Sequence, residues 1–226
     1  MTIAYTNGVS IILCTNKPFL IRNAIANFLR VKFSEKEMHV IVNHDSPEFL
    51  DSWRNFSSGY ENIHVHKAPD NFSLGHCLNY GVTLCKYNYI AKFDDDDYYG
   101  PSYLQNSMQE FRNTNVDIVA RRWYYLYFIE RNELYLDYHN LMRGGTLMFR
   151  RWVNSEIPFQ DISLGEDITF VQEAMDRGIS IKGLDHRDFV YVRNDNLQHT
   201  WRASFEEITG SSTFVAHTRN YVPFVK

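Results

Sequence analysis

Four consecutive aspartates, Asp94 to Asp97, form the part of this sequence that most strongly indicates chemistry. Adjacent carboxylates repel one another and are costly to bury unpaired, so such a run lies in solvent or beside a cation. The run directly follows an apolar segment, Tyr87 to Phe93, that is a predicted strand. Ligands of open α/β sheets bind outside the carboxyl ends of strands. Hard carboxylate oxygens suit Mg²⁺ or Mn²⁺ shared with substrate phosphates, and we therefore expect a phosphate-bridging metal site rather than a solvated loop.

A second acidic pair, Glu166-Asp167, follows Gly165 at the start of a predicted helix. Acidic side chains are common at helix starts because they interact favourably with the positive end of the helix dipole. The functional alternative is a general base held at a rigid helix start and pointing into a cleft. Spacing along the chain does not bring this pair close to the four aspartates, so only the fold can decide.

The elements that position these residues alternate along the first hundred residues. Short apolar, β-branched runs are typical of buried strands, and stripes at helical spacing lie between them. Such alternation predicts βαβ units, a parallel sheet and right-handed crossovers. The predicted strands are Val9 to Leu13, Met38 to Val42, Ile63 to His66 and Tyr87 to Phe93, and the predicted helices begin at Pro18, Pro47, Leu74 and Pro101.

The second half of the chain has a different pattern. Asp117 to Ala120 and the aromatic stretch up to Tyr138 favour antiparallel strands, with Arg131-Asn132 as a turn. Further strands are expected at Gly144 to Phe149, Ile179 to Lys182 and Phe189 to Arg193, and a helix at Glu166 to Arg177, closed by Gly178. No repeat or linker is evident. We therefore expect one α/β domain over residues 1–226 in two halves, at about 1–100 and about 101–226, with a mostly parallel central sheet flanked by helices and a smaller antiparallel portion.

Composition limits the classes of protein that this chain represents. With 226 residues, 44% of them hydrophobic and 22% charged, it can bury a core without disulfides. A formal net charge of −4 gives no reason to expect general nucleic-acid binding. The three cysteines show no metal-binding spacing; Cys14 and Cys85 lie in apolar runs and are expected to be core residues. An odd number of cysteines, no signal-peptide pattern and no apolar run of membrane-spanning length predict a soluble, cytoplasmic protein.

Five segments, in their order along the chain, together resemble the GT-A glycosyltransferases, specifically the large inverting family 2. The resemblance covers about residues 9 to 200. The aspartate segment and the Glu-Asp pair are the more specific parts. The segments are Cys14-Thr15-Asn16-Lys17-Pro18 after the first strand, Asn71 to Gly81 with its two Asn-Gly spacings, Tyr89 to Pro101, Gly144 to Phe149 and Glu166-Asp167.

The resemblance implies a nucleotide-binding half at about 1–100, an acceptor-side half at about 101–226, and a role for several of these residues. Asp96 would hold the metal ion, Mn²⁺ or Mg²⁺, and Asp94 or Asp95 would contact the donor ribose or the water shell of the metal. Thr15 would line the nucleotide pocket, with Asn71 also on the donor side. Asp167 would be the catalytic base, beside Glu166.

Some positions depart from the family pattern. The second strand usually ends in an Asp-Asp-x-Ser motif that reads the nucleotide base; this chain has Val42-Asn43-His44-Asp45-Ser46, and both Asn43 and Asp45 are candidates for that role. Leu78 stands where the family has an arginine before the second Asn. Near the C-terminus, His199 is a candidate for the metal shell or the diphosphate, and Arg193 for a phosphate contact, although both types of residue are also common on surfaces.

The predicted activity is transfer of a sugar from a nucleotide diphosphate donor, with UDP as the expected nucleotide, to a hydroxyl of a glycan, glycolipid or protein, with inversion. Two alternatives stay open. One is a sugar-nucleotide-binding module without catalysis; the other is a nucleotidyltransferase, which would need a Gly-rich basic loop that Cys14 to Phe19 does not provide.

Two further patterns have structural and functional interpretations. The aromatic residues from Trp123 to Phe128 could stack on an acceptor sugar, but aromatic residues are common in strands, and we expect these to pack within a sheet. His64 and His66 have a spacing that can bind zinc, but no third ligand is evident in the sequence.

Overall fold

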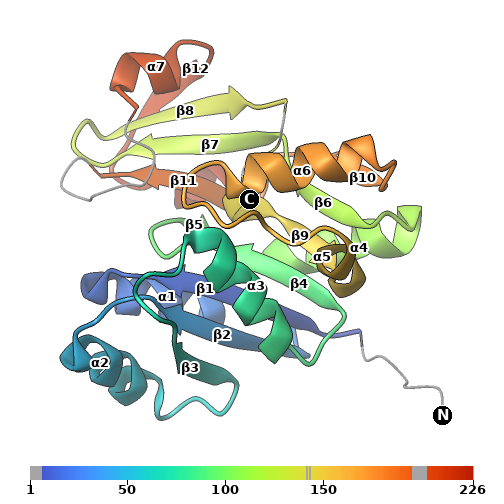
Figure 1. Ribbon diagram of the computed structural model, residues 1–226. Helices are drawn as coiled ribbons and strands as arrows, with labels where there is room; N and C mark the ends of the chain where they lie inside the picture. Colours follow the sequence, from blue (N-terminus) through green and yellow to red (C-terminus); the bar gives the residue numbers. More distant parts are fainter. Residues whose placement is uncertain (1–6, 141, 143, 195–202, 226) are drawn as a thin grey trace.

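The computed structural model describes residues 7–140, 142, 144–194 and 203–225, which form two sheets (Figure 1). The larger sheet has seven strands in the order β10-β6-β9-β4-β1-β2-β3, and the smaller has five in the order β12-β8-β7-β11-β5. The four strands predicted in the first half of the chain are all present and adjacent. Their bounds are Val9–Thr15 for β1, Lys36–Val42 for β2, Ile63–Lys67 for β3 and Tyr89–Phe93 for β4.

Strand β1 lies at the centre of the parallel part of the larger sheet. It pairs with β2 on one side and β4 on the other, both in parallel, and its carboxyl end at Thr15 is level with Val42 of β2. The aspartates that follow Phe93 therefore leave the same edge of the sheet as Thr15 and Asn43. Because carboxyl ends of parallel strands meet at one edge, the sheet gathers these motifs there.

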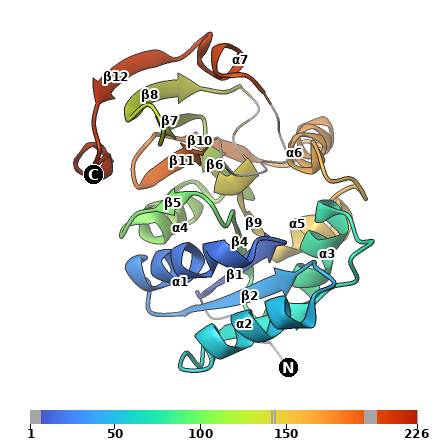
Figure 2. The same ribbon diagram turned by 90° about the vertical axis from the view of Figure 1, so that its left-hand side faces the viewer.

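Helices cover both faces of this sheet, as the two ribbon views show (Figures 1 and 2). Alternate residues of β1 point to opposite faces: Ile11 packs in the core with helices α1, α2 and α4, and Ile12 with α3, α5 and α6. The helices are α1 at Ile21–Arg30, α2 at Pro47–Ser57, α3 at Leu74–Leu84, α4 at Tyr103–Thr114, α5 at Arg151–Glu156 and α6 at Glu166–Asp176.

The helix boundaries follow local signals. Pro18 begins a short 3-10 turn at Pro18–Leu20 rather than the α-helix itself, and α1 starts three residues later. Ser73 caps α3 by accepting a hydrogen bond from the His76 amide. Gly178, predicted to close α6, has a φ of +70°, a conformation that glycine adopts without strain.

The strands β6 (Ile118–Arg121), β9 (Met148–Arg150) and β10 (Ile181–Leu184) extend the larger sheet beyond β4. The antiparallel strand predicted at Asp117 to Ala120 is present as β6, which runs antiparallel to β9. β9 also runs antiparallel to β4, whereas β6 and β10 pair with each other in parallel. The expected strand over Gly144 to Phe149 is shorter, because Gly144–Thr146 forms a 3-10 turn and pairing begins at Met148.

The smaller sheet is built on the aromatic hairpin. Strands β7 (Trp123–Phe128) and β8 (Glu133–Tyr138) are antiparallel, and Asn132 in the turn has a positive φ of 53°. β11 (Phe189–Arg193) is present as predicted. The sequence patterns did not indicate β5 (Tyr98–Tyr99), α7 (Phe205–Thr209), β12 (Thr213–His217) or the 3-10 turn Val222–Phe224.

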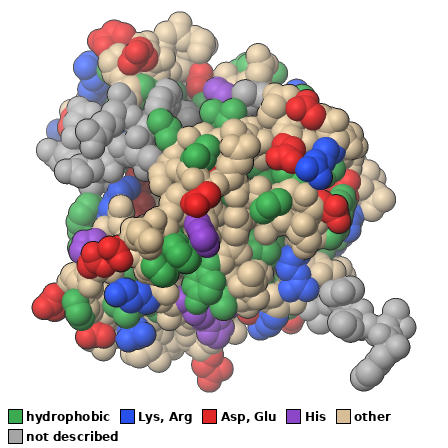
Figure 3. All heavy atoms as spheres, viewed as in Figure 1, with side chains coloured by type: hydrophobic (Ala, Val, Ile, Leu, Met, Phe, Trp, Pro, Cys, Tyr) green, Lys and Arg blue, Asp and Glu red, His purple; other side chains and the backbone are tan. Residues whose placement is uncertain are grey.

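Surface charge is mixed on the face shown in Figure 3. Acidic and basic side chains are interspersed there, without a broad patch of either sign. Among the helices that the structure describes, none combines the length and the hydropathy needed to span a membrane.

Candidate active site

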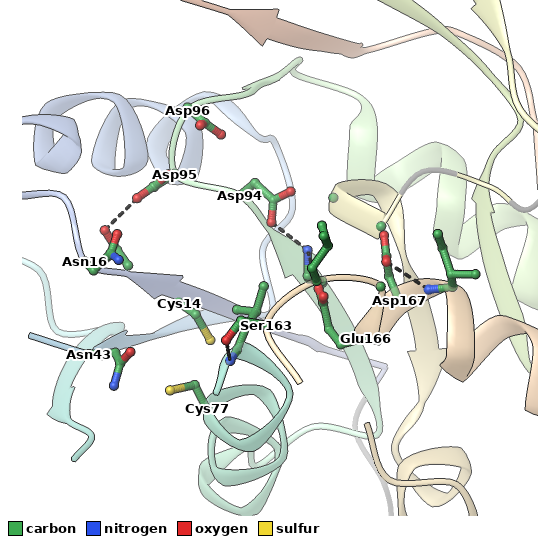
Figure 4. A pocket seen from close by; sticks show the side chains of 18 of the residues that line it. Cys14, Asn16, Asn43, Cys77, Asp94, Asp95, Asp96, Ser163, Glu166 and Asp167 are labelled. Carbon is green, nitrogen blue, oxygen red and sulfur yellow. Dashed lines mark hydrogen bonds and ion pairs between the residues drawn. The ribbon is translucent and has the colours of Figure 1, made fainter. Parts of the chain in front are cut away.

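A pocket of about 570 Å³ opens at the carboxyl ends of β1, β2 and β4 (Figure 4). Its walls come from segments far apart in the sequence, including the start of α6 and the turn Gly144–Thr146. Predicted site residues that line it are Thr15, Asn43, Asp94, Asp95, Asp96 and Asp167.

The aspartate loop is held against the end of β1. Thr15 donates a hydrogen bond from Oγ1 to Asp95 Oδ2 at 2.6 Å, and Lys17 Nζ lies 3.3 Å from Asp95 Oδ1 and 3.0 Å from Asp96 Oδ2. Asp95 is only 5% exposed. Burial and the neighbouring charge of Asp96 raise the pKa of Asp95 to about 6, even though Lys17 and Thr15 act in the opposite direction. Asp95 and Asp96 thus share one ammonium group, that of Lys17, between two carboxylates.

Asp97 has a structural role in the same loop. Its Oδ1 accepts a hydrogen bond from the Val192 amide of β11 at 3.0 Å. Its carbonyl oxygen accepts from the side-chain amides of Asn23 and Asn27 on α1. These bonds fix the loop between α1 and the smaller sheet, so the first three aspartates are the ones that face the pocket.

Lys92 connects the two acidic motifs. It lies in β4, is 4% exposed, and places Nζ 2.7 Å from Asp94 Oδ1 and 3.9 Å from Glu166 Oε1. Burial alone would lower the pKa of Lys92, but the Asp94 and Glu166 carboxylates raise it above its ordinary value. Burial, with the charge of Asp167, raises the pKa of Glu166 to about 7, although Lys92 acts in the opposite direction. The sequence signal for this role is a charged residue inside an otherwise apolar strand.

The turn containing Gly144 and Gly145 brings Asp94 and Asp167 to one place. A β-carbon added to Gly144 would overlap Asp167 Oδ2, and one added to Gly145 would lie 2.6 Å from Asp94 Oδ2. Only glycine lets the backbone approach both carboxylates this closely. Asp167 Oδ1 also accepts a hydrogen bond from the Ile168 amide at 2.8 Å, which orients the carboxylate at the first turn of α6. The fold therefore joins two motifs that lie about 70 residues apart in the sequence.

Other predicted residues lie away from the pocket. Asp45 is exposed and faces Asp70, and this neighbouring carboxylate raises the pKa of Asp45. The other candidate after β2, Asn43, does line the pocket, and its side chain donates a hydrogen bond to the Pro69 carbonyl. Asn71 is exposed and outside the pocket lining. Arg193 is buried and donates a hydrogen bond to the hydroxyl of Tyr191, which itself lines the pocket. His199 lies outside the described residues.

Two cysteines line the pocket, which the sequence interpretation did not foresee. Cys14 is only partly buried, at the end of β1, and Cys77 is buried in α3, while Cys85 is a core residue as expected. Burial raises the pKa of Cys14, and it raises the pKa of Cys77 to about 11. Both thiols are therefore protonated near neutral pH and are poor nucleophiles.

The histidine pair of β3 has a third histidine as its neighbour. His39 of β2 pairs with His64 in the sheet register, and its Nδ1 lies 3.1 Å from His66 Nε2. Its Nε2 is 3.3 Å from Glu37 Oε1. Even so, within the described ranges no set of three or more His, Cys, Asp or Glu side chains is arranged to hold a metal ion by itself.

Comparisons with known proteins place this geometry in a family. Residues 10–165 match the sequence model of "Glycosyl transferase family 2". Curated protein sequences give no match. A crystal structure of S. aureus TarS 1-349 in complex with UDP-GlcNAc superposes with a TM-score of 0.68 at 15% identity, covering 90% of this chain and 64% of that one.

A second solved structure has a different nucleotide sugar. The mannosyltransferase PcManGT from Pyrobaculum calidifontis, in complex with GDP-Man and Mn²⁺, gives a TM-score of 0.64 at 14% identity, covering 84% of this chain and 59% of that one. The chain thus spans about three fifths of the length of the structures it matches. Because the family match covers more than half of the sequence and the fold agrees, the chain belongs to glycosyl transferase family 2 and has the GT-A fold.

Proposed function

We propose that this protein transfers a sugar from a nucleotide diphosphate donor to a hydroxyl acceptor, with inversion at the anomeric carbon and with the help of a divalent cation. The observation that carries the proposal is the shared turn Gly144–Gly145, which contacts Asp94 on one side and Asp167 on the other. A donor whose diphosphate lies at the aspartates would have its sugar close to Asp167.

The nucleotide end of the donor is proposed to lie at the β1 and β2 side of the pocket. Thr15 and Asn43 line the wall there, and Asn43 can accept a hydrogen bond from the imide N–H of uracil through its side-chain oxygen. UDP is therefore the proposed nucleotide. Of the two candidates after β2, Asn43 is therefore proposed for this contact rather than Asp45, which lies outside the lining of the pocket, as does Asn71.

The aspartate loop fits a divalent cation. Asp94, Asp95 and Asp96 all line the pocket, and the single ammonium group of Lys17 faces both Asp95 and Asp96. Asp96 is the proposed ligand, with Asp94 or Asp95 at the ribose or the water shell, and His199 and Arg193 remain proposed contacts to the metal and phosphates. Because the described side chains do not complete a metal site, the remaining ligands would include donor phosphate oxygens. When bound, the cation would offset charge that develops on the departing diphosphate.

Asp167 is proposed as the general base. The acceptor hydroxyl gives its proton to Asp167 as its oxygen forms the bond to the anomeric carbon, and the bond from that carbon to the diphosphate oxygen breaks with its electron pair leaving on the diphosphate. The Ile168 amide and the Gly144 backbone hold the Asp167 carboxylate in place. The Lys92 ammonium group forms ion pairs with Asp94 and Glu166. Asp167 forms no such ion pair with the residues that the structure describes and is therefore the carboxylate proposed to accept the proton. One base acting in a single displacement produces inversion.

The division of labour between the two halves of the chain is likewise a proposal. Residues 1–100 supply the β1, β2 and β4 ends that line the proposed nucleotide side of the pocket, and residues 101–226 supply the Gly144–Gly145 turn and Asp167. The acceptor is proposed to be a hydroxyl of a glycan, a glycolipid or a protein.

The proposal is tested by incubating the purified protein with UDP-sugars and GDP-sugars, with Mn²⁺ or with chelator, and measuring nucleoside diphosphate release. We expect release with UDP-sugars only when the metal is present. Release of pyrophosphate would instead support a nucleotidyltransferase. Donor binding without any release, even with a panel of acceptor sugars, would support a binding module and contradict the proposal.

A further inference from the structure

A second pocket, of about 200 Å³, lies between α4 and the end of the edge strand β10, away from the candidate active site. Figure 1 shows α4, β6 and β10 together at the side of the larger sheet. The lining combines three cationic side chains, two carboxylates and one amide. The polar residues of the wall are Asn106, Glu110, Arg121, Lys182, Asp185 and Arg187.

The unusual feature of this pocket is Arg121, the last residue of β6. The side chain is 1% exposed and its Nη1 makes no hydrogen bond. Its Nε donates to the Arg187 carbonyl at 2.9 Å, and its guanidinium lies 4.3 Å from the centre of the Tyr103 ring. In the described part of the chain, no carboxylate oxygen lies within 4.0 Å of a guanidinium nitrogen of Arg121, so Arg121 has no ion pair there.

Such an arrangement is energetically unfavourable by itself. A buried charge without a paired counter-charge loses its hydration without recovering the energy elsewhere. Burial lowers the pKa of Arg121, and the carboxylates of Asp185 and Asp188 only partly oppose this from a longer distance. Arginine remains charged in proteins, so the missing partner of Arg121 is an anion.

A second cation lies on the same side of the sheet. Strand β10 pairs in register with β6, so that Lys182 is next to Val119 and Leu184 is next to Arg121. Residues two apart in a strand share a face, and Lys182 therefore points to the face that carries Arg121. Lys182 is exposed at the pocket wall, while Arg187 is already paired with Asp185 at 2.7 Å. Arg121 and Lys182 are thus the two cations available to a ligand.

We propose that this pocket binds a small oxyanion, either a phosphate or a carboxylate group, with Arg121 as the buried anchor and Lys182 at the entrance. The guanidinium fork matches the oxygen spacing of both groups. Glu110, also in the wall, opposes binding and limits the affinity. The site would lie directly behind the active-site turn, because the Arg121 amide donates to Thr146 Oγ1 at 2.9 Å and Tyr103 donates its hydroxyl to the Thr146 carbonyl. The inference is independent of the proposed sugar transfer.

The test is a titration with inorganic phosphate, sulfate and succinate at an ionic strength held constant with KCl, followed by thermal unfolding and by calorimetry, without donor or metal. With a Kd of about 1 mM, about 20 mM phosphate would raise Tm by about 4 °C. We expect one phosphate per chain. A response to succinate but not to phosphate would assign a carboxylate ligand, and the reverse would assign a phosphate ligand.

Four variants locate the ion. Arg121→Met should abolish the ligand-dependent shift without lowering the basal Tm, since it removes an unpaired buried charge. Lys182→Gln should weaken binding several-fold, and Glu110→Gln should strengthen it by a similar factor. Lys32→Gln, which alters an exposed lysine in the loop between α1 and β2 and outside the pocket lining, is the matched control and should change nothing.

Two results would overturn the proposal. The first is the absence of any shift with all three anions, or a shift that Arg121→Met leaves unchanged. The second is a shift abolished by Lys17→Met, which would place the anion in the donor pocket. If Arg121→Met does not fold, the opposite effects of Lys182→Gln and Glu110→Gln decide, because no general salt effect produces both.

Discussion

The ammonium nitrogen of Lys17 lies 3.0 Å from Asp96 Oδ2, so a lysine occupies the position where the proposed cation would meet its principal ligand. The same nitrogen is 3.3 Å from Asp95 Oδ1. The carboxylates raise the pKa of Lys17 above its ordinary value, and the side chain therefore stays charged at neutral pH. Lys17 thus partly neutralises the loop and would compete with the proposed divalent cation for Asp96.

We expect that Lys17→Met binds Mn²⁺ more tightly than the unaltered protein, by about tenfold, because one competing positive charge is removed. Electron paramagnetic resonance of free Mn²⁺ in the absence of donor measures this affinity directly. Lys32→Met, at an exposed site, serves as the control. Equal or weaker Mn²⁺ binding by Lys17→Met would show that the lysine does not compete with the ion.

Asp167→Asn should lower sugar transfer by at least about a thousandfold, since an amide cannot accept the acceptor proton at neutral pH. Donor affinity, measured by calorimetry with the UDP-sugar and Mn²⁺, should stay within about threefold of the original. Asp176→Asn on the same helix removes one exposed carboxylate and should leave both quantities unchanged. Transfer by Asp167→Asn at a rate close to that of the control would assign the base elsewhere.

Gly144→Ala should reduce turnover strongly while leaving the protein folded. The new methyl group would overlap Asp167 Oδ2 and lie 2.8 Å from Asp167 Cβ, so the displaced group is the side chain of the proposed base. Gly145→Ala should act instead on Asp94 and therefore weaken Mn²⁺ or donor binding. Gly59→Ala, where the added methyl meets nothing within 4 Å, is the control. Identical kinetic defects in the two active-site variants would contradict this separation of roles.

Acidification should destabilise the protein through the histidine cluster of His39, His64 and His66. Burial and the nearby charges of His39 and His64 lower the pKa of His66 from 6.5 to about 4. The other charged groups packed against the cluster are Glu37 and Lys86, which form an ion pair with each other. Between pH 6.5 and 4 the unfolded chain therefore binds a proton that the folded protein does not, and the free energy of unfolding falls as pH falls.

The expected loss from this group between pH 7 and pH 5 is about 1 kcal/mol, after allowance for solvent screening of a partly exposed ring. Urea unfolding at both pH values measures it, and His66→Gln should remove that part of the pH dependence. His217→Gln, which alters an exposed histidine, should leave it in place. If His66→Gln and the unaltered protein lose the same stability on acidification, the cluster is not the cause.

Much of the fold and part of the site could be predicted from local pattern. The alternation of buried strands with helical stripes gave β1 to β4 and α1 to α4 in order, because each of these elements buries one face against its neighbours in the chain. The positions of Thr15 and Asp94 at strand ends follow from the same alternation. β12 and α7 were missed, since β12 is mostly exposed and lacks an alternating apolar pattern.

The local sequence pattern does not decide whether Asn43 or Asp45 faces the pocket. Both follow β2 within three residues, and spacing alone does not say which side chain turns inward. The structure places Asn43 in the pocket wall and leaves Asp45 outside, beside Asp70. Lys17 and Lys92 had no assigned role for the same reason, because each acts through carboxylates contributed by other segments.

By itself, the sequence determined the class of fold, the four-aspartate run at the end of a strand and the acidic start of α6. These are properties of neighbouring residues, and hydrophobic periodicity and charge repulsion are visible at short range. Only the tertiary structure decided that the Gly144–Gly145 turn brings Asp94 and Asp167 together and that Lys92 links Asp94 to Glu166. It likewise decided that Arg121 is buried without a carboxylate partner among the described residues. Contacts between distant segments depend on how whole strands pair and pack, and no spacing along the chain encodes them.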